Sequence, residues 1–285
     1  MGNPYTFKNE YIETTHKGKY CNAKIGRKID LKNCTLGDFK DSKRRIVAIG
    51  NSNLFSFIQA FDRFIENNYA VTIIPAAGMN VTPNITLRTT SEEYEKYYWE
   101  EVVPNLIDGL NKNDILFLVS EMVDQINSDY RPAEWQINYN QFIPINNNDQ
   151  KKNLLIFKND LINLIEKVSI KGIKVAVMRP IPNPTDCYGF RKQWFNKLNN
   201  NKSCRFKSKD QIKNDSLLIN KVLTDLETDY PDKFKAVDLF DLFCPGNICS
   251  YYDKNKNLLY VDGQHPSIFS ARQSQDLIFK DLKDF

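Results

Sequence analysis

Residues 45–53 read RIVAIGNSN, a short apolar run that ends in a glycine and small polar residues. The run is rich in β-branched side chains, which favour strands, and its apolar residues do not alternate strictly with polar ones. Such a strand is typical of a sheet buried on both faces, as in a parallel α/β layer. Apolar residues then recur at helical spacing, at Phe55, Ile58, Phe61 and Ile65. We therefore expect a strand, a turn at Ser52, and a helix.

Four further apolar runs along the chain are similar to the first: Ala70–Ile74, Asp114–Val119, Ile173–Met178 and Lys235–Phe240. Helical spacing is found between and after them, notably at residues 154–168 and 212–226, and a last helix is expected at about residues 267–282. Pro104 is expected to kink or end a helix that begins near Tyr94. Strand and helix alternate five times. This predicts an α/β fold, a three-layer α/β/α sandwich with a five-stranded parallel sheet of the flavodoxin-like kind.

The polar first part of the chain differs from the rest. Residues 1–42 contain few apolar runs, and we expect an irregular N-terminal extension there. Residues 43–285 hold the alternating pattern without an internal repeat or a clear linker, which predicts one α/β domain. A chain of 285 residues is large enough to bury a core without metals.

Composition excludes several classes of protein. Charged residues make up 26% and hydrophobic residues 41% of the chain, which is typical of a globular protein. The net charge is +4 with both signs interspersed, whereas a nucleic-acid partner usually requires a clustered basic stripe. No apolar run reaches the ~18 residues that a membrane-spanning helix needs, so we expect no direct membrane span in this chain.

The six cysteines fall into local pairs: Cys21 with Cys34, Cys187 with Cys204, and Cys244 with Cys249. This pattern favours three disulfides and an oxidising compartment, whether periplasmic, luminal or extracellular. The alternative is six unrelated thiols in a cytosolic protein. No metal site is expected, because Cys-x-x-Cys is absent and the chain has only two histidines, His16 and His265. No cofactor is expected either.

Ser52 lies where the first strand passes into its helix. Gly50 permits a tight turn, and the N–H groups at a helix start lack intrahelical partners. A serine here would stand at the carboxyl edge of the sheet with its own N–H available to an oxyanion. Taken alone, however, this turn favours a plainer interpretation, in which Ser52 is a helix N-cap or a phosphate-loop residue.

The C-terminal part of the chain favours the interpretation of Ser52 as a nucleophile. Asp262 and His265 lie in one loop, after the fifth strand and before the last helix. A nucleophilic serine needs a general base, most often a histidine. Asp262 can reach Nδ1 of His265 and hold its tautomer, while His16 lies in the polar extension and is expected to be incidental. The two motifs together predict a triad of Ser52, His265 and Asp262.

Two groups of residues give the chain a resemblance to a known family. Residues 34–38 (CTLGD) and 45–52 (RIVAIGNS) are similar to the approach to the nucleophile block of SGNH/GDSL hydrolase-fold domains. Residues 242–245 (LFCP), Cys249, 259–262 (LYVD) and 265–267 (HPS) are similar to the end of that fold. More narrowly, the chain from about Tyr20 onward resembles the soluble SGNH domain fused to membrane acyltransferase-3 (AT3) proteins, which O-acetylate polysaccharides.

The resemblance implies roles for particular residues. Ser52 would be the nucleophile, His265 the base and Asp262 its orienting acid, and the N–H groups of Ser52 and Gly78 would form an oxyanion hole. Three places depart from the family pattern: Asn51 where Asp is usual, Asn53 where His is frequent, and residues 119–122 (VSEM) where an Asn is often supplied. We therefore expect one oxyanion donor to be missing or replaced, and such a loss costs on the order of 100-fold in rate.

The resemblance further implies O-acyl transfer, most simply O-acetyl transfer, through an acyl-Ser52 intermediate. The partners would be an acyl donor, a carbohydrate acceptor and a membrane AT3 module. Alternatives are a stand-alone carbohydrate esterase or deacetylase and a non-catalytic glycan-binding domain. A flavodoxin-like cofactor binder is less favoured, because residues 50–53 have too few glycines and hydroxyls to cradle a phosphate. The candidate substrate-binding residues are Asn53, Glu121, Trp135, Tyr139 and Trp194, whose aromatic members would form either a sugar platform or loop core.

Overall fold

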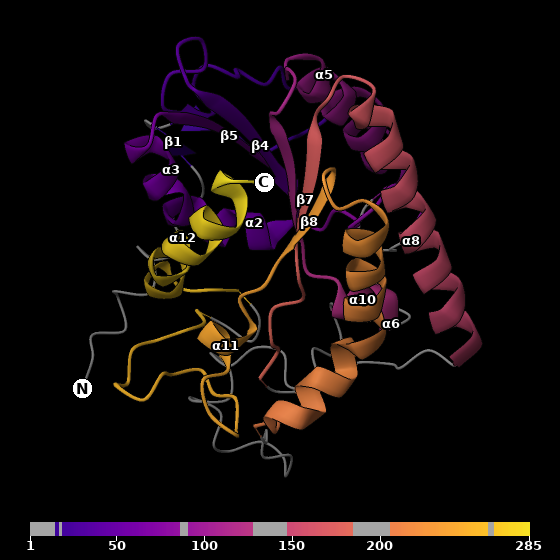
Figure 1. Cartoon of the computed structure of the whole chain (residues 1–285), viewed down its shortest axis with the longest axis vertical. Helices are drawn as coiled ribbons and strands as arrows, with labels where there is room; N and C mark the ends of the chain where they lie inside the picture. Colours follow the sequence, from indigo (N-terminus) through magenta and orange to yellow (C-terminus); the bar gives the residue numbers. More distant parts are fainter. Residues whose placement is uncertain (1–14, 17–18, 86–90, 128–146, 185–205, 262–264) are drawn as a thin grey trace.

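A computed structural model describes residues 15–16, 19–85, 91–127, 147–184, 206–261 and 265–285. Within these ranges the chain forms a three-layer α/β/α sandwich (Figure 1). Its main sheet has the strand order β3-β5-β4-β6-β7-β8. The predicted α/β/α sandwich is therefore confirmed, with one more strand than the apolar runs indicated.

Five strands of this sheet are parallel: β4 (Arg44–Gly50), β5 (Tyr69–Pro75), β6 (Ile115–Val119), β7 (Lys174–Met178) and β8 (Phe234–Val237). The sixth, β3 (Thr35–Leu36), is antiparallel to β5. A separate two-stranded sheet pairs β1 (Thr15–His16) with β2 (Lys19–Tyr20). Strand β8 is shorter than its apolar run, because Phe240 already begins helix α11 (Phe240–Phe243).

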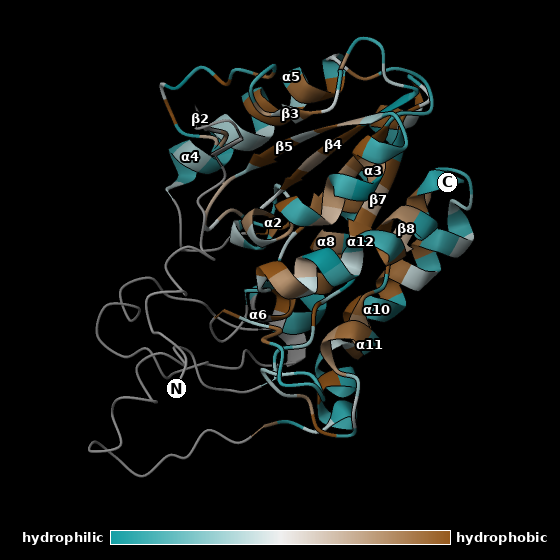
Figure 2. Ribbon diagram, turned by 90° about the vertical axis from the view of Figure 1, so that its left-hand side faces the viewer, coloured by the Kyte–Doolittle hydropathy of each residue, from teal (hydrophilic) through white to brown (hydrophobic). Residues whose placement is uncertain are grey.

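Each face of the main sheet is covered by helices, as the continuous apolar strands predict. From β4, Val47 and Ile49 lie in one core cluster together with residues of α8 (Asn147–Ser169) and α10 (Lys209–Asp229). Ile46 and Ala48 lie in the cluster on the other face, with residues of α12 (Ile268–Lys283). In Figure 2 the sheet and the inner sides of these helices are mostly brown, whereas the outer helix sides are largely teal.

Shorter helices complete the two layers: α2 (Ser52–Ser56), a 3-10 helix (Ile58–Phe61), α3 (Asp62–Glu66), α4 (Glu92–Lys96), a π-helix (Tyr97–Val102), α5 (Val103–Asp108) and α6 (Val123–Asn127). Pro104 does not end the helix that contains Tyr94, since it lies in the first turn of α5 directly after the π-helix. Proline has no backbone N–H to donate, and a proline in the first turn of a helix therefore costs no intrahelical bond. The wider turn of the π-helix directly precedes it.

Disulfides close two loops of the described chain. Cys21–Cys34 holds the segment leading into β3, and within that segment Ala23 N–H donates to the Pro75 carbonyl at the end of β5. Cys244–Cys249 closes the loop after α11. Cys187 and Cys204 lie outside the described residues. Residues 21–42 thus contribute strand β3 and buried cysteines to the sheet layer.

Strand β8 is the outer parallel strand, and one of its outward N–H groups is covered by a side chain. The Ala236 N–H donates to Glu227 Oε1 on α10 at 2.9 Å, while Glu227 Oε2 binds Arg179 at 2.6 Å. Unpaired strand edges are sites where other chains add on, and native proteins commonly cover them.

Among the described helices, none combines the length and apolar character required to cross a bilayer.

Candidate active site

Ser52 is the first residue of helix α2, directly after the carboxyl end of β4. The N-cap is Asn51, whose Oδ1 accepts the Asn53 N–H at 3.1 Å. The plainer interpretation of Ser52 as the cap residue is therefore wrong, since Asn51 fills that position. The Ser52 side chain is partly exposed, whereas both neighbours are 3% exposed.

Gly50 permits the approach of β4 to β6 at this turn. Its φ is 151°, and a Cβ added there would lie 1.8 Å from the Val119 carbonyl oxygen and 2.7 Å from the carbonyl carbon. Real side chains do not tolerate such distances, so only glycine fits. The turn that carries Ser52 is consequently held tightly against the end of β6.

His265 reaches Ser52 from the opposite end of the chain. Its Nε2 lies 2.8 Å from Ser52 Oγ, across 213 residues of sequence. The histidine is held by its own backbone, because its carbonyl accepts the Val261 N–H at 2.9 Å. Next to it, Tyr260 and Pro266 form an antiparallel bridge, and Ser267 caps helix α12. Asp262 lies outside the described residues.

The loops after β4 and β6 are joined by the Asn51 side chain. Besides capping α2, Asn51 Oδ1 accepts the Glu121 N–H at 3.2 Å, and Nδ2 donates to the Glu121 carbonyl at 3.5 Å. The Asn51 N–H donates to Ser120 Oγ at 3.3 Å. Asn51 therefore supplies the acceptor that an Asp would supply in the family pattern. Its amide is also engaged with backbone groups.

The loop after β5 brings Gly78 to the same edge. Residues 76–79 form a turn in which the Met79 N–H donates to the Ala76 carbonyl at 3.1 Å, and Gly78 has φ 73°. A positive φ at this third position is what a type II turn requires. The turn is attached to the nucleophile strand, since the Ala76 N–H donates to the Gly50 carbonyl at 2.8 Å.

Gln125 on α6 supports this loop from the other side. Its Oε1 accepts the Val81 N–H at 2.7 Å, and its Nε2 donates to the Met79 carbonyl at 3.3 Å. The side chain is buried, and so is Asn80 between the two contacts. Sequence reasoning did not identify Gln125, because an isolated glutamine after a strand has no distinctive pattern.

Tyr98 is the second residue that sequence reasoning missed. Its hydroxyl accepts the Gly50 N–H at 3.1 Å and donates to the Ile74 carbonyl at 3.0 Å. The residue is fully buried, and this burial raises the pKa of its hydroxyl well above the ordinary value, so the group stays protonated. In the sequence it is one of several aromatic residues before Pro104, and nothing in the pattern distinguishes it from the others.

The candidate substrate-binding residues fall into two groups. Asn53 and Glu121 lie at the site, on the turns after β4 and β6. The Asn53 side chain is buried, and its Oδ1 has no hydrogen-bond partner among the described residues. Glu121 is partly exposed. Trp135, Tyr139 and Trp194 lie outside the described residues. Within the described chain, no group of three or more His, Cys, Asp and Glu residues is placed to hold a metal ion.

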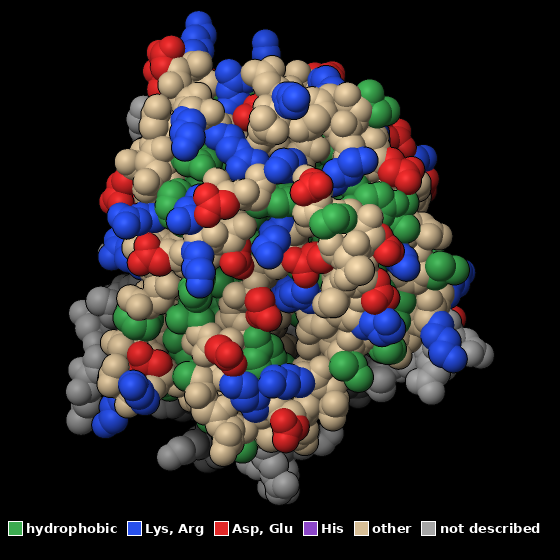
Figure 3. Space-filling view, in the orientation of Figure 1, with side chains coloured by type: hydrophobic (Ala, Val, Ile, Leu, Met, Phe, Trp, Pro, Cys, Tyr) green, Lys and Arg blue, Asp and Glu red, His purple; other side chains and the backbone are tan. Residues whose placement is uncertain are grey.

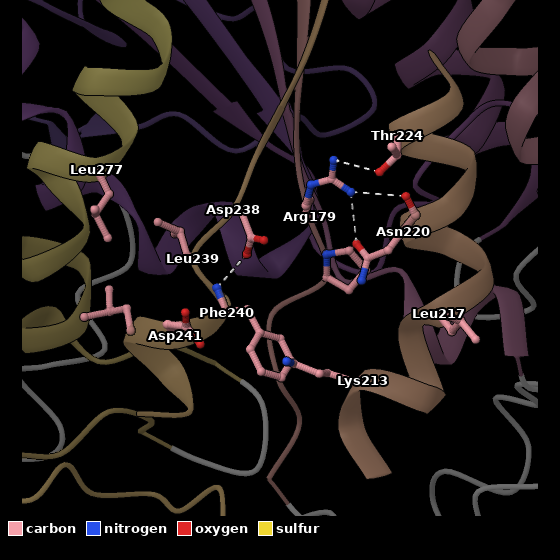
Figure 4. A pocket seen from close by; sticks show the side chains of 12 residues that line it. Arg179, Lys213, Leu217, Asn220, Thr224, Asp238, Leu239, Phe240, Asp241 and Leu277 are labelled. Carbon is pink, nitrogen blue, oxygen red and sulfur yellow. Dashed lines mark hydrogen bonds between the residues drawn. The ribbon is translucent and has the colours of Figure 1, made fainter. Parts of the chain in front are cut away.

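A pocket of about 700 Å³ opens beyond β7 and β8 at the same sheet edge (Figure 4). Its lining includes Arg179, Lys213, Asn220, Thr224, Asp238 and Phe240, and Ser52 is not part of it. Figure 4 shows Arg179 directed at Asn220 and Thr224, with which it forms hydrogen bonds. Over this face of the molecule, acidic and basic side chains are interspersed (Figure 3), as the sequence indicated.

Comparisons with known proteins agree with this architecture. The family model described as "SGNH domain (fused to AT3 domains)" matches residues 18–280. The periplasmic domain of a lipopolysaccharide acetyltransferase from Salmonella ser. Paratyphi A has a similar structure, with 10% identity, 98% of this chain and 95% of that chain covered, and a TM-score of 0.54. At this identity the similarity concerns the fold.

Two further structures match with lower TM-scores. An acetyl-xylooligosaccharide esterase variant from Geobacillus shares 13% identity over 85% of this chain and 95% of its own, with a TM-score of 0.47. The catalytic domain of a Streptococcus pneumoniae peptidoglycan O-acetyltransferase shares 11% identity over 86% and 94%, with a TM-score of 0.39. A search of curated proteins returns no match. From the family match over residues 18–280, the chain belongs to the family of SGNH domains fused to AT3 domains and is an enzyme of the SGNH acyltransferase or esterase type.

Proposed function

We propose that the chain transfers an acyl group, most simply acetyl, to a carbohydrate hydroxyl through an acyl-Ser52 intermediate. The observation that carries this proposal is the 2.8 Å separation between His265 Nε2 and Ser52 Oγ. This distance lies within the range at which a general base takes a proton from a nucleophile. Asp262 is assigned the orienting role at Nδ1 by the sequence argument.

The proposed reaction has two halves. His265 takes the Ser52 proton as Oγ attacks the ester carbonyl of the donor. The donor C–O bond then breaks, and His265 returns the proton to the departing alcohol. In the second half a hydroxyl of the acceptor loses its proton to His265 and attacks the acyl carbon. The bond from that carbon to Ser52 Oγ then breaks, and His265 returns the proton to Oγ. Water in place of the sugar hydroxyl would make the same site an esterase.

The oxyanion of each half would be held by the backbone N–H groups of Ser52 and Gly78. Both lie on turns at the carboxyl edge, and each turn is hydrogen-bonded to the end of β4 or β6. The Asn51 amide is engaged with Glu121 and is not available as a third donor. The site would therefore work with fewer side-chain donors than the family pattern supplies, which predicts modest turnover.

The carbohydrate acceptor and the AT3 partner are proposed from the family. Its description places the SGNH domain in fusion with AT3 domains, and the structure with the TM-score of 0.54 is the periplasmic domain of a lipopolysaccharide acetyltransferase. The two disulfides favour an oxidising compartment, whether periplasmic, luminal or extracellular. An acyl donor delivered by a membrane AT3 module would fit this assignment.

Release of the alcohol from an activated acetyl ester tests the proposed nucleophile, because in the first half-reaction the alcohol departs while the acetyl group stays on Ser52. We expect a burst that matches the enzyme concentration and is abolished in Ser52→Ala and His265→Ala, with His16→Ala as the matched histidine control. Asp262→Asn should reduce the rate by several orders of magnitude. Turnover that survives both Ser52→Ala and His265→Ala would contradict the assigned site.

An added acceptor distinguishes transferase from esterase. With acetylated enzyme and an oligosaccharide, a transferase gives acetylated sugar detectable by mass spectrometry, and an esterase gives only acetate. If the wild-type protein binds the oligosaccharide but shows neither a burst nor steady turnover, the non-catalytic alternative replaces the proposal.

A further inference from the structure

The Tyr98 hydroxyl connects two strands at the point where both pass into the proposed oxyanion turns. It accepts a hydrogen bond from Gly50, two residues before Ser52, and donates one to Ile74, four residues before Gly78. These partners are 48 and 24 residues away in sequence. One oxygen atom thus bridges the end of β4 and the end of β5, beside the backbone bond from the Ala76 N–H to the Gly50 carbonyl.

The surroundings of Tyr98 allow this hydroxyl little freedom. The side chain is fully buried, and its ring packs edge-on against Trp99 with centroids 5.5 Å apart. The residue belongs to the π-helix, a rare element that is frequently found at functional sites. Because burial keeps the hydroxyl protonated, it acts as donor and acceptor at once.

From this geometry we infer that Tyr98 is a positioning residue for the proposed reaction, which sets the spacing between the Ser52 and Gly78 N–H groups. The inference rests on the proposed function. Removing the hydroxyl takes one hydrogen-bond partner from the buried Gly50 N–H and one from the buried Ile74 carbonyl, at the last residue pair of the β4–β5 ladder, so we expect the two turns to shift relative to each other. Oxyanion donors act only when aimed at the developing charge, and a misplacement of about 1 Å costs up to ~100-fold in rate.

Tyr98→Phe and Tyr94→Phe form a matched pair for the test. Tyr94 precedes the same π-helix, and its hydroxyl also donates to a backbone carbonyl, that of Ala23, at 2.6 Å. Its hydroxyl forms no hydrogen bond to either oxyanion turn among the described residues, so both variants remove one phenol oxygen, fully buried in Tyr98 and partly buried in Tyr94, from the same helical region. Both should lower the unfolding temperature, but only Tyr98→Phe should alter the chemistry.

The full chain is assayed with an activated acetyl ester, and rates are normalised to burst-titrated active sites. We expect kcat to fall about 10- to 100-fold in Tyr98→Phe with KM within about twofold, because the loss concerns the transition state. In Tyr94→Phe, kcat should stay within about twofold. Equal kcat values in the two variants would overturn the inference while leaving the proposed function intact.

Hydrogen exchange supplies a measurement that does not depend on activity. The Gly50 amide should lose protection in Tyr98→Phe and keep it in Tyr94→Phe, and unchanged protection would contradict the contact. Should Tyr98→Phe not fold, a fluorinated tyrosine at position 98 retains the oxygen but makes it more acidic. Once this hydroxyl loses its proton it can no longer donate to Ile74, so kcat should decrease at high pH, and at a lower pH in the fluorinated variant than in the wild type. The same pH dependence in both proteins would count against the inference. A wild-type protein that shows neither a burst nor steady turnover would refute the proposed function instead.

Discussion

Replacing Asn51 separates the role of its acceptor oxygen from that of its amide. In Asn51→Ala, the Asn53 and Glu121 N–H groups lose the oxygen that each binds at 3.1 and 3.2 Å. In Asn51→Asp both acceptor contacts remain, and only the 3.5 Å donor contact to the Glu121 carbonyl is lost. The two variants should therefore differ in stability and in turnover.

The magnitude follows from the two lost bonds. Loss of an N-cap acceptor costs about 1 kcal/mol. A buried N–H left without an acceptor adds about 1–3 kcal/mol, so the free energy of unfolding should fall by about 2–4 kcal/mol in Asn51→Ala. A chain of this size loses about 2–4 °C in Tm per kcal/mol, which predicts a decrease of about 4–16 °C. Asn51→Asp should lose about 1 kcal/mol, since the lost donor bond is long.

Urea unfolding and the burst assay measure these effects together. We expect kcat to decrease at least about tenfold in Asn51→Ala, because the turn that carries Ser52 loses both side-chain bonds to Glu121 and keeps only the Asn51 N–H bond to Ser120 Oγ. The decrease in Asn51→Asp should be smaller. Ser91→Ala is the control, since Ser91 caps α4 through the Tyr94 N–H and has no contact with the site. Equal losses of stability in the Ala and Asp variants would refute the reasoning.

Further predictions concern the backbone, the disulfides and pH. Gly50→Ala should abolish at least 99% of turnover, about 100-fold, since its Cβ would meet a carbonyl 1.8 Å away, whereas Gly246→Ala, with 3.7 Å of room, should not. Replacing the Cys21–Cys34 pair by serines should cost about 3 kcal/mol and the Cys244–Cys249 pair about 2 kcal/mol in urea unfolding, because the first closes the longer loop. Burial raises the pKa of Tyr98 above its ordinary value of about 10. Its contribution is therefore complete below pH ~10 and is lost as pH rises toward the folded-state value, so the urea midpoint should fall less steeply in Tyr98→Phe than in the wild type.

The parallel sheet could be predicted because each strand leaves a local signal. Short apolar runs identify the five parallel strands, and their continuity predicts helices on both faces. Strand β3 has only two residues, Thr35 and Leu36, too few for any periodicity. It depends on pairing with β5, which is contributed by a distant part of the sequence.

The site could be predicted in part. A histidine before the last helix and a serine after the first strand are an informative pair, because few residue types can activate a hydroxyl. The cap could not be assigned, since Asn51 and Ser52 are both good N-cap residues. Tyr98 and Gln125 could not be found at all, because their role lies in backbone contacts that exist only after folding.

The Glu227 carboxylate at the outer edge of the sheet has a consequence for assembly. A foreign β-strand that tried to extend the sheet past β8 would need the Ala236 N–H, and that donor is already occupied by an oxygen from α10. The other oxygen is bound by Arg179, so a foreign strand would also have to break an ion pair. Before α10 has packed, the Ala236 N–H of β8 is open to pairing with another strand. Docking of this helix thus shields the chain from self-association in the same step that completes its core.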